Sequence, residues 1–123
     1  MASEIPGHYQ ALVTSTTTGA TTGLIPDDAS FVTVTSSASG NFVTIPAGYV
    51  GQQIRGWSTA NGFKFRTIAA SANTVNNVDV SGGTVGAAIP ATVFFLLEKV
   101  TATAWLLRTR TNLGAEGTAI VPA

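Results

Sequence analysis

The side chains that could do chemistry in this chain are few and stand apart from one another. The single histidine, His8, could act as a general base, but a base needs a nucleophile and an orienting partner, and neither adjoins it. Asp27 and Asp28 offer oxygen ligands for a hard cation, yet calcium takes about six to eight such ligands, and neighbours on an extended chain point to opposite faces. We expect these two residues to form a turn after Pro26 instead.

No residue is marked by its surroundings as a catalytic group. Glycoside hydrolysis needs two carboxylates at a set separation, and none of the six acidic residues is singled out as a member of such a pair. Serine and threonine are plentiful, but no base stands beside them. We therefore expect a protein that is not an enzyme, with no catalytic residue, no metal site and no cofactor.

A cluster of polar residues precedes Ser81-Gly82-Gly83 and consists of Asn73, Asn76, Asn77 and Asp79. Such side chains could bind calcium or line a sugar-binding edge. Their spacing matches neither the EF-hand loop nor the glycine-rich calcium nonapeptide. Because Asn and Asp also hydrogen-bond to nearby backbone at strand ends, the pattern favours structural capping.

Three basic residues, Arg55, Lys64 and Arg66, could form a stripe beside which Trp57 stacks on a base or a sugar. The alternative is a strand that faces solvent or another subunit, with Glu98 or Asp79 nearby as a counter-charge. We favour this alternative. The six basic residues are dispersed and balanced by six acidic ones, which argues against a nucleic-acid partner.

The composition indicates a protein with an unusually uncharged surface. Of its 123 residues, 45% are hydrophobic and only 10% are charged, against roughly 25% charged in soluble domains, and the formal net charge is +0. We therefore expect copies of the chain or a partner to cover much of the surface. The sequence has no cysteine, no secretory signal and no apolar run near the roughly 20 residues that cross a bilayer, so we expect no disulfide and no membrane partner.

The elements that must position these residues are short runs of Val, Phe, Ile and Thr, each ended by Gly, Pro or Asn. No stretch keeps helical periodicity over three turns. The fold class is therefore all-β, and the regular spacing favours an antiparallel β-sandwich or jelly-roll-like module. The expected strands are 31–35, 41–45, 52–58, 63–68, 75–80, 93–100 and 105–110.

Two turns and one apolar run indicate how these strands meet. Asn61-Gly62 is a strong hairpin signal that should pair 52–58 with 63–68. Residues 101–104 should turn 93–100 back into 105–110, with Trp105 as a core anchor and both Arg108 and Arg110 on the opposite face. The run 94–97, Phe-Phe-Leu-Leu, predicts a strand that is covered on both faces.

The two ends of the chain differ in composition from its middle. Residues 1–23 are rich in Thr, Ala and Gly and have little apolar area to offset their ordering entropy, so we expect an N-terminal arm or linker. Residues 24–110 should form the β-sandwich domain, and 111–123, again small and weakly charged, a C-terminal tail. Deletion of residues 1–20 should then leave the domain folded.

The segment 42–52, Phe-Val-Thr-Ile-Pro-Ala-Gly-Tyr-Val-Gly-Gln, resembles small β-modules of tailed-bacteriophage virion proteins, in which a strand leads into a Leu/Ile-Pro-Ala-Gly turn. A Gly-Phe hairpin, an Asn-rich strand and a closing hairpin that ends near Trp follow in those modules. They correspond here to Asn61-Gly62-Phe63, to 74–79 and to Trp105-Leu106-Leu107, so the similarity covers roughly residues 24–110. The chain is most similar to capsid decoration (cement) proteins, and it is similar to tail-fibre domains as well.

The resemblance implies a structural virion protein that decorates and stabilises a bacteriophage capsid. It would be made in the host cytoplasm and bind the outer surface of the major capsid protein, as a homotrimer at local three-fold positions. Terminal arms add contacts where neighbours are fixed on a lattice, and many copies give avidity. The expected contacts with the capsid and between subunits are apolar residues near the two ends: Ile5, Tyr9, Leu12, Leu113, Ile120 and Val121.

Two other functions stay open from the residues alone. A tail-fibre module would bind a receptor or a glycan through a face that contains Tyr49, Trp57, Asn76 and Asn77. Loss of glycan binding on Trp57→Ala would favour it. A small hydrolase of surface polysaccharide would instead show turnover that disappears when one carboxylate is replaced.

Overall fold

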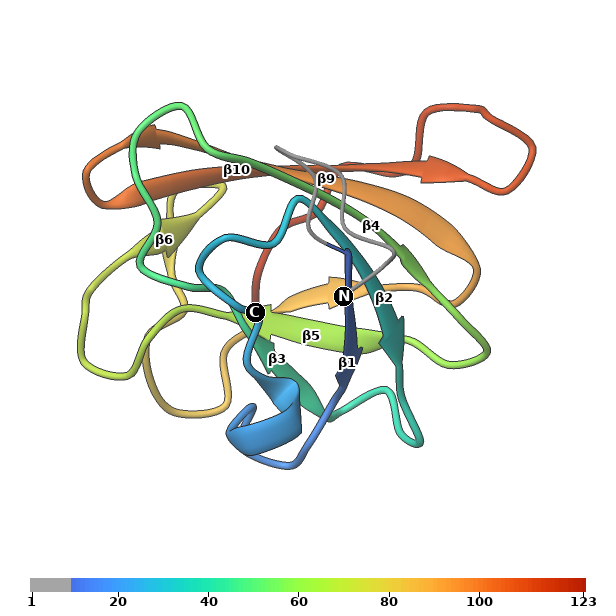
Figure 1. The fold of residues 1–123 in the computed structure, drawn as a ribbon, viewed down its shortest axis with the longest axis horizontal. Coiled ribbons are helices and arrows are strands. Elements are labelled where there is room, and N and C mark those ends of the chain that lie inside the picture. Colours follow the sequence, from blue (N-terminus) through green and yellow to red (C-terminus); the bar gives the residue numbers. More distant parts are fainter. Residues whose placement is uncertain (1–9) are drawn as a thin grey trace.

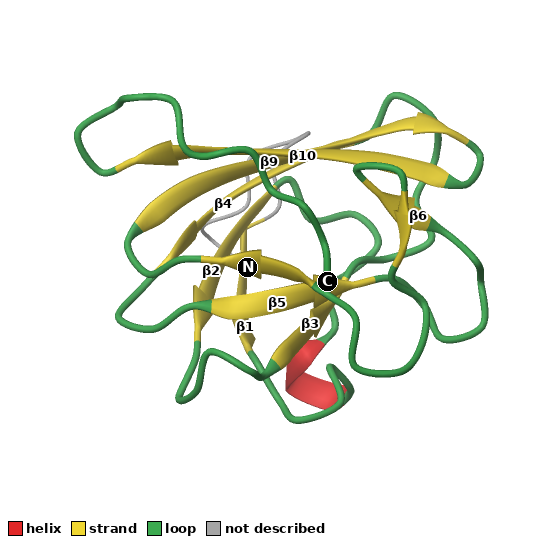
Figure 2. Ribbon diagram, turned by 180° about the vertical axis from the view of Figure 1, so that it is seen from behind, coloured by secondary structure: helices red, strands yellow, loops and turns green. Residues whose placement is uncertain are grey.

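The computed structural model describes residues 10–123, and this part of the chain is nearly all β (Figures 1 and 2). The all-β fold class is therefore confirmed. Besides one short 3₁₀ turn, η1 (Thr21–Gly23), the described elements are the strands β1 Gln10–Thr14, β2 Phe31–Thr35, β3 Phe42–Thr44, β4 Gln53–Ser58, β5 Phe63–Arg66, β6 Thr74–Val75, β7 Val78–Asp79, β8 Ala87–Ile89, β9 Val93–Thr101 and β10 Ala104–Thr111. Within these residues, no helix is long and apolar enough to cross a membrane.

The strands form two mixed sheets, so the expectation of an antiparallel module is wrong. A seven-stranded sheet has the order β1-β2-β4-β9-β10-β6-β7, and a three-stranded sheet has the order β3-β5-β8. The pairs β1–β2, β2–β4, β3–β5 and β6–β10 are parallel, whereas β4–β9, β9–β10, β5–β8 and β6–β7 are antiparallel. After β2 the chain passes through β3 in the other sheet before it returns as β4, and such a crossover makes β4 parallel to β2.

The core lies between the two sheets and follows the alternation of the strands. Phe63 and Phe65 of β5 are buried while Lys64 and Arg66 lie on the opposite side, as the sequence predicts. The rings of Phe63 and Phe65 meet the ring of Phe95 on β9 edge to face, with centroids 6.1 and 5.0 Å away. Three aromatic rings thus join the two sheets.

The hairpin of β9 and β10 forms where it was predicted, and its inner face completes the core. Trp105 and Leu107 are buried, and Arg108 and Arg110 lie on the opposite, exposed face with Leu106. Strand β2 behaves in the same way, since Val32 and Val34 are fully buried. Alternation therefore identified the inner and outer faces of these strands.

Gly56 lets the central strands approach each other on the inner side of the large sheet. It is the cross-strand neighbour of Val32 on β2 and of Phe95 on β9. A Cβ built on Gly56 would lie 2.1 Å from Cζ of Phe95 and 2.3 Å from the carbonyl oxygen of Val32. The Phe95 ring therefore occupies the space that a side chain at position 56 would need.

The Asn61-Gly62 hairpin expected between 52–58 and 63–68 is not formed. β4 and β5 belong to different sheets, and neither Asn61 nor Gly62 has the positive φ that a type I′ turn requires. A Cβ on Gly62 would lie 2.4 Å from the carbonyl oxygen of Ile89. Glycine is thus required here because the chain passes close to the end of β8.

The tight two-residue turn is found instead inside the segment 75–80, which was expected to be a single strand. Asn76 and Asn77 have φ values of 49° and 70° and join β6 to β7 as a short hairpin. Asparagine tolerates this left-handed conformation better than most residues. The single-strand prediction for 75–80 is therefore wrong.

The described part of the expected N-terminal arm, residues 10–23, belongs to the domain. β1 pairs with β2 along its full length from Gln10 to Thr14, and Val13 is buried in the core. The segment after β1 has small side chains because it packs closely against the domain. A Cβ built on Gly19 would lie 2.6 Å from Oγ1 of Thr44. The domain boundary at residue 24 is thus wrong, and deletion of residues 1–20 would remove a strand of the sheet.

The expected C-terminal tail, residues 111–123, also returns to the domain. The backbone N–H of Gly117 donates to the carbonyl oxygen of Thr109 (2.8 Å), and Gly86 and Ala123 exchange two backbone hydrogen bonds of 3.1 and 3.2 Å. A Cβ on Gly117 would lie 2.0 Å from Oγ1 of Thr109. The small residues of this segment allow close packing against the sheet, so the segment is not a free arm.

Candidate functional site

The outer side of the seven-stranded sheet collects apolar and basic side chains from five neighbouring strands. Alternate residues of a strand point to opposite sides of the sheet. The residues that alternate with the buried core residues therefore point outward. We call this surface the outer sheet face. Its members are Leu12 of β1, Phe31 and Thr33 of β2, Gln53, Arg55 and Trp57 of β4, Phe94, Leu96 and Glu98 of β9, and Leu106, Arg108 and Arg110 of β10.

Strand β9 supplies the apolar centre of this face. Phe95 and Leu97 are buried, whereas Phe94 exposes 45% of its surface and Leu96 is half-buried. The strand therefore alternates like its neighbours, and the prediction that both of its faces are covered is not met by the described residues. An exposed phenylalanine in the middle of a sheet costs solvation free energy, which makes Phe94 a candidate contact residue.

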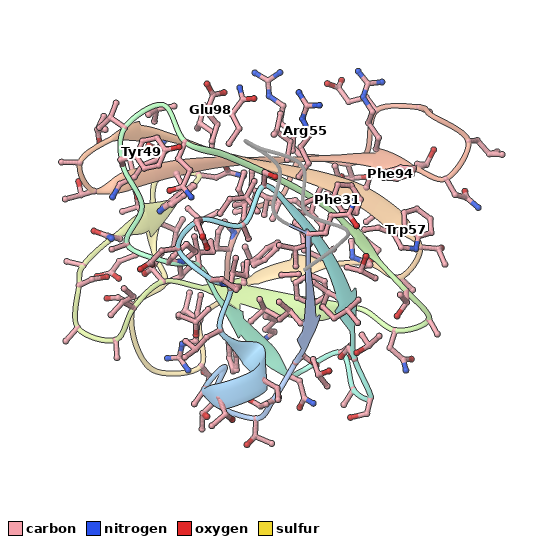
Figure 3. All side chains as sticks on the ribbon, viewed as in Figure 1. Phe31, Tyr49, Arg55, Trp57, Phe94 and Glu98 are labelled. Carbon is pink, nitrogen blue, oxygen red and sulfur yellow. The ribbon has the colours of Figure 1, made fainter. Side chains whose placement is uncertain are left out.

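Trp57 and Phe94 form an aromatic pair on this face. They are cross-strand neighbours, and their ring centroids lie 4.5 Å apart with the planes tilted by 51°. Figure 3 shows both rings, together with Phe31, toward the same end of the sheet. Such a pair stabilises the two strands by about 0.5–1.5 kcal/mol beyond its buried area, and it holds a rigid apolar surface in place.

Three of the six basic residues of the chain stand beside these rings. Arg55 and Arg108 are both cross-strand neighbours of Leu96, and Arg110 is the neighbour of Phe94. Nη1 of Arg110 donates to the carbonyl oxygen of Gly114 at 3.1 Å. The guanidinium groups of Arg55 and Arg108 make no hydrogen bond or ion pair with any residue that the structure describes.

A shallow cavity of about 330 Å³ opens on the outer sheet face. Apolar residues, three arginines and one carboxylate line it together. The lining residues are Phe31, Arg55, Gly56, Phe94, Phe95, Leu96, Arg108, Thr109, Arg110 and Glu116. Aromatic and arginine side chains around a desolvated centre are typical of protein–protein contact surfaces.

The apolar residues expected to contact a capsid do not form one surface. Leu12, Leu113 and Val121 expose 86%, 91% and 77% of their surface, so all three are available for contact. Leu12 lies on the outer sheet face, Leu113 in the turn after β10 and Val121 close to the C-terminus. Ile120 packs against the core and is half-buried. Ile5 and Tyr9 lie outside the described residues.

The four residues of the alternative ligand face are not brought together either. Tyr49 is 67% exposed in the loop before β4, and Figure 3 shows it at the opposite end of the large sheet from Trp57. The turn of Asn76 and Asn77 lies beside the start of β10, whereas Trp57 lies beside Phe94, which pairs with the far end of that strand. A single glycan face made of all four residues is therefore wrong.

Asn76 is engaged in the fold. Its Oδ1 accepts the backbone N–H of Leu107 (2.9 Å), and its Nδ2 donates to the carbonyl oxygens of Leu107 (3.2 Å) and Ile120 (2.9 Å). The side-chain amide thus continues the pairing of β6 with β10 after the backbone has turned away. This confirms the capping interpretation for Asn76.

Asp79 is a cap as well. Its Oδ1 accepts hydrogen bonds from Oγ of Ser81 (2.6 Å) and from the backbone N–H of Ser81 (2.8 Å). The Ser81 side chain first, and then its backbone, hold the pKa of the Asp79 carboxyl below its ordinary value. The polar cluster 73–79 is therefore explained at these two positions by turn formation.

The Asp79 turn predicts a small acid sensitivity. Because the pKa is lower in the folded state, the ionised cap stabilises the fold above the unfolded pKa of about 3.9, and this contribution is lost as the pH falls through the lower folded pKa. The Asp79→Asn protein should therefore lose less stability between about pH 6 and about pH 3 than the wild type. Urea unfolding midpoints at the two pH values measure this. The matched control is Asp28→Asn, which removes an exposed carboxylate elsewhere in the chain.

The stripe of Arg55, Lys64 and Arg66 is not formed, because β4 and β5 belong to different sheets. The guanidinium of Arg66 lies over the ring of Phe42 at 4.7 Å from its centroid and donates to the carbonyl oxygens of Thr18 and Gly83. These contacts tie two loops to the small sheet. The arginines that join Arg55 are those of β10 instead.

Lys99 is the buried cation of the described chain, with 5% of its surface exposed. Its Nζ donates to the carbonyl oxygen of Ala47 and lies 5.9 Å from the centroid of the Trp105 ring. Nε1 of Trp105 is buried and has no hydrogen-bond partner among the described residues. The lysine thus fixes the loop before β4 against the core, which is a structural role.

The described residues contain no group of three His, Cys, Asp or Glu side chains that could hold a metal ion. The sequence analysis did not identify Phe31, Phe94 and Leu96 as surface residues. Glu98 lies on the same side of β9 as Phe94 and Leu96, and its charge is a signal that this side faces outward. No protein-family model, curated protein or solved structure matches the chain.

Proposed function

We propose that this protein is a structural component of a bacteriophage virion that decorates and stabilises the capsid by binding the outer surface of the major capsid protein. The proposal includes a homotrimer, synthesis in the host cytoplasm, and no enzymatic activity. The observation that carries it is the outer sheet face, where exposed aromatic rings and three arginines gather on a chain that is otherwise poor in charge, and two of these guanidinium groups have no partner among the described residues. The sequence resemblance to decoration proteins is the reason for proposing a bacteriophage capsid as the binding partner.

A finer fold assignment belongs to the same proposal. We infer a β-sandwich, supported by the aromatic contacts that join Phe63 and Phe65 of the small sheet to Phe95 of the large one. A sandwich of this kind buries one side of the large sheet and leaves the other for docking. The outer sheet face replaces the terminal arms as the main contact surface, because residues 10–23 and 111–123 pack onto the domain.

The proposed function predicts that replacing Phe94 removes the protein from virions. A carboxylate in place of this exposed ring should break an apolar contact, so the copy number of Phe94→Asp should fall at least about tenfold, for a loss of about 1.4 kcal/mol or more. Virions of the phage are assembled with wild-type or variant protein and purified. Quantitative mass spectrometry then counts copies relative to the major capsid protein.

The matched control is Tyr49→Asp, which makes the same kind of change on an exposed ring at the other end of the molecule. It should assemble like the wild type. For the wild type we expect a ratio that is a sizeable fraction of one. A handful of wild-type copies would place the protein in the tail or a fibre, and absence from virions would refute the virion assignment.

A further inference from the structure

We propose that the outer sheet face binds an acidic, extended segment of its protein partner, with its carboxylates among Arg55, Arg108 and Arg110 and its apolar side chains on Phe94 and Leu96. This inference rests on the proposed function, since it names the chemistry of the capsid surface that the face would contact. The evidence is the register of the arginines, the lack of side-chain partners for Arg55 and Arg108 among the described residues, and the placement of the carboxylates around them.

The register places the guanidinium groups on both sides of an apolar residue. Arg55 and Arg108 flank Leu96 on the two neighbouring strands, so their backbones lie about 10 Å apart, two strand spacings. Arg110 follows Arg108 on the same face of β10, about 7 Å along the strand. Alternate residues of an extended peptide repeat at that same distance, so two carboxylates separated by one residue match the spacing of Arg108 and Arg110.

The arginines are free to pair with a partner. The guanidinium groups of Arg55 and Arg108 make no hydrogen bond or ion pair with a described residue, and the guanidinium of Arg110 donates one hydrogen bond to the carbonyl oxygen of Gly114. A guanidinium that faces a carboxylate can make two parallel hydrogen bonds, which are stronger than neutral ones. The apolar surface between the arginines excludes water from such pairs and strengthens them.

The two carboxylates of this region argue against a phosphate backbone as the partner. Glu116 lines the same cavity, and Glu98 follows Leu96 on the outer side of β9. Their charge would repel a continuous row of phosphates, and nucleic-acid binding needs a broader basic surface. A segment with one or two carboxylates among apolar residues is attracted by the arginine end of the face and kept away from Glu98. The charge pattern thus orients the partner along the strands.

The test measures binding of the full-length protein to purified capsids that lack it. Arg55→Gln and Arg108→Gln should each weaken binding about tenfold at low salt and reduce its salt dependence. Lys64→Gln, which removes the same charge from the other sheet, should bind like the wild type. Glu98→Gln should bind more tightly than the wild type, an increase that a purely structural role for the residue would not produce. Thermal denaturation checks that all variants are folded.

The outcomes separate this inference from the function on which it rests. If the wild type does not bind capsids, both proposals fail. If the wild type binds but both arginine variants bind equally well, the acidic-segment inference fails and the capsid proposal stands. Weaker binding of Glu98→Gln would indicate a basic partner and would also overturn the inference.

Discussion

Replacing Gly56 with alanine is expected to lower the free energy of unfolding by about 3 kcal/mol or more, and the melting temperature by about 10 °C. The added Cβ would lie 2.1 Å from Cζ of Phe95 and 2.3 Å from the carbonyl oxygen of Val32. A ring can rotate away from such a contact, but the backbone of β2 cannot, because β2 is paired on both sides. The variant must therefore separate the central strands or displace the Phe95 ring from the aromatic cluster that joins the sheets.

Urea and thermal unfolding of Gly56→Ala measure the effect, with Gly82→Ala as the matched control. Gly82 has open space around its Cα and no positive φ, so its replacement should be neutral or raise stability slightly. The double variant Gly56→Ala/Phe95→Leu should lose less stability than the sum of the two single variants, because the smaller side chain relieves one of the two clashes. A melting temperature of Gly56→Ala equal to that of the wild type would contradict the packing described for the central strands.

The parts of the fold that could be predicted from sequence are those set by alternation of apolar and polar residues. Phe63 and Phe65 share the inner side of β5, and Trp105 and Leu107 share the inner side of β10, because strand geometry makes this periodicity equal to two. Apart from the β9–β10 hairpin, pairing between strands could not be predicted. It depends on which sheet each strand joins, and Asn61-Gly62 carries the chain between sheets although the dipeptide favours a hairpin.

Segments of small residues are compatible either with a free arm or with a backbone that packs closely against the domain, and the structure shows close packing. Gly19 and Gly117 stand in segments that were expected to be arms because they contain little apolar area. In the fold these glycines let the backbone lie against Thr44 and Thr109. Composition gives the size of the side chains but does not show whether another segment packs beside them. The close packing of these two segments could therefore not be predicted from the sequence.

The outer sheet face was predictable only in part. The positions of Arg108 and Arg110 follow from the phase of β10, and that prediction is confirmed. Their meeting with Arg55 and Phe94 depends on the parallel and antiparallel neighbours of β4 and β9, which no local pattern encodes. The candidate site therefore depends on the strand topology. The sequence contains the residues of the site, but it does not show which of them become neighbours.

Replacing Asn76 with glycine is expected to lower the free energy of unfolding by about 2–4 kcal/mol, although glycine accepts the positive φ of this position without strain. The loss comes from hydrogen bonds. Without the side-chain amide, the N–H and the carbonyl oxygen of Leu107 both lose a partner, and the carbonyl oxygen of Ile120 loses the bond that ties the C-terminal segment to β6. Unsatisfied polar groups in a partly buried place cost about 1–3 kcal/mol each.

The companion variant Asn77→Gly separates the two contributions of the turn. Asn77 has a φ of 70°, is exposed and makes no side-chain hydrogen bond with a described residue, so glycine there should be neutral or slightly stabilising. In Asn76→Gly, amide hydrogen exchange should rise across 117–123 as well as at Leu107, because one side chain holds both segments. If exchange rises at Leu107 but not in 117–123, the two backbone bonds between Gly86 and Ala123 hold the C-terminal segment without help from Asn76. If Asn76→Gly and Asn77→Gly unfold at the same urea concentration, the amide of Asn76 does not contribute the hydrogen bonds assigned to it.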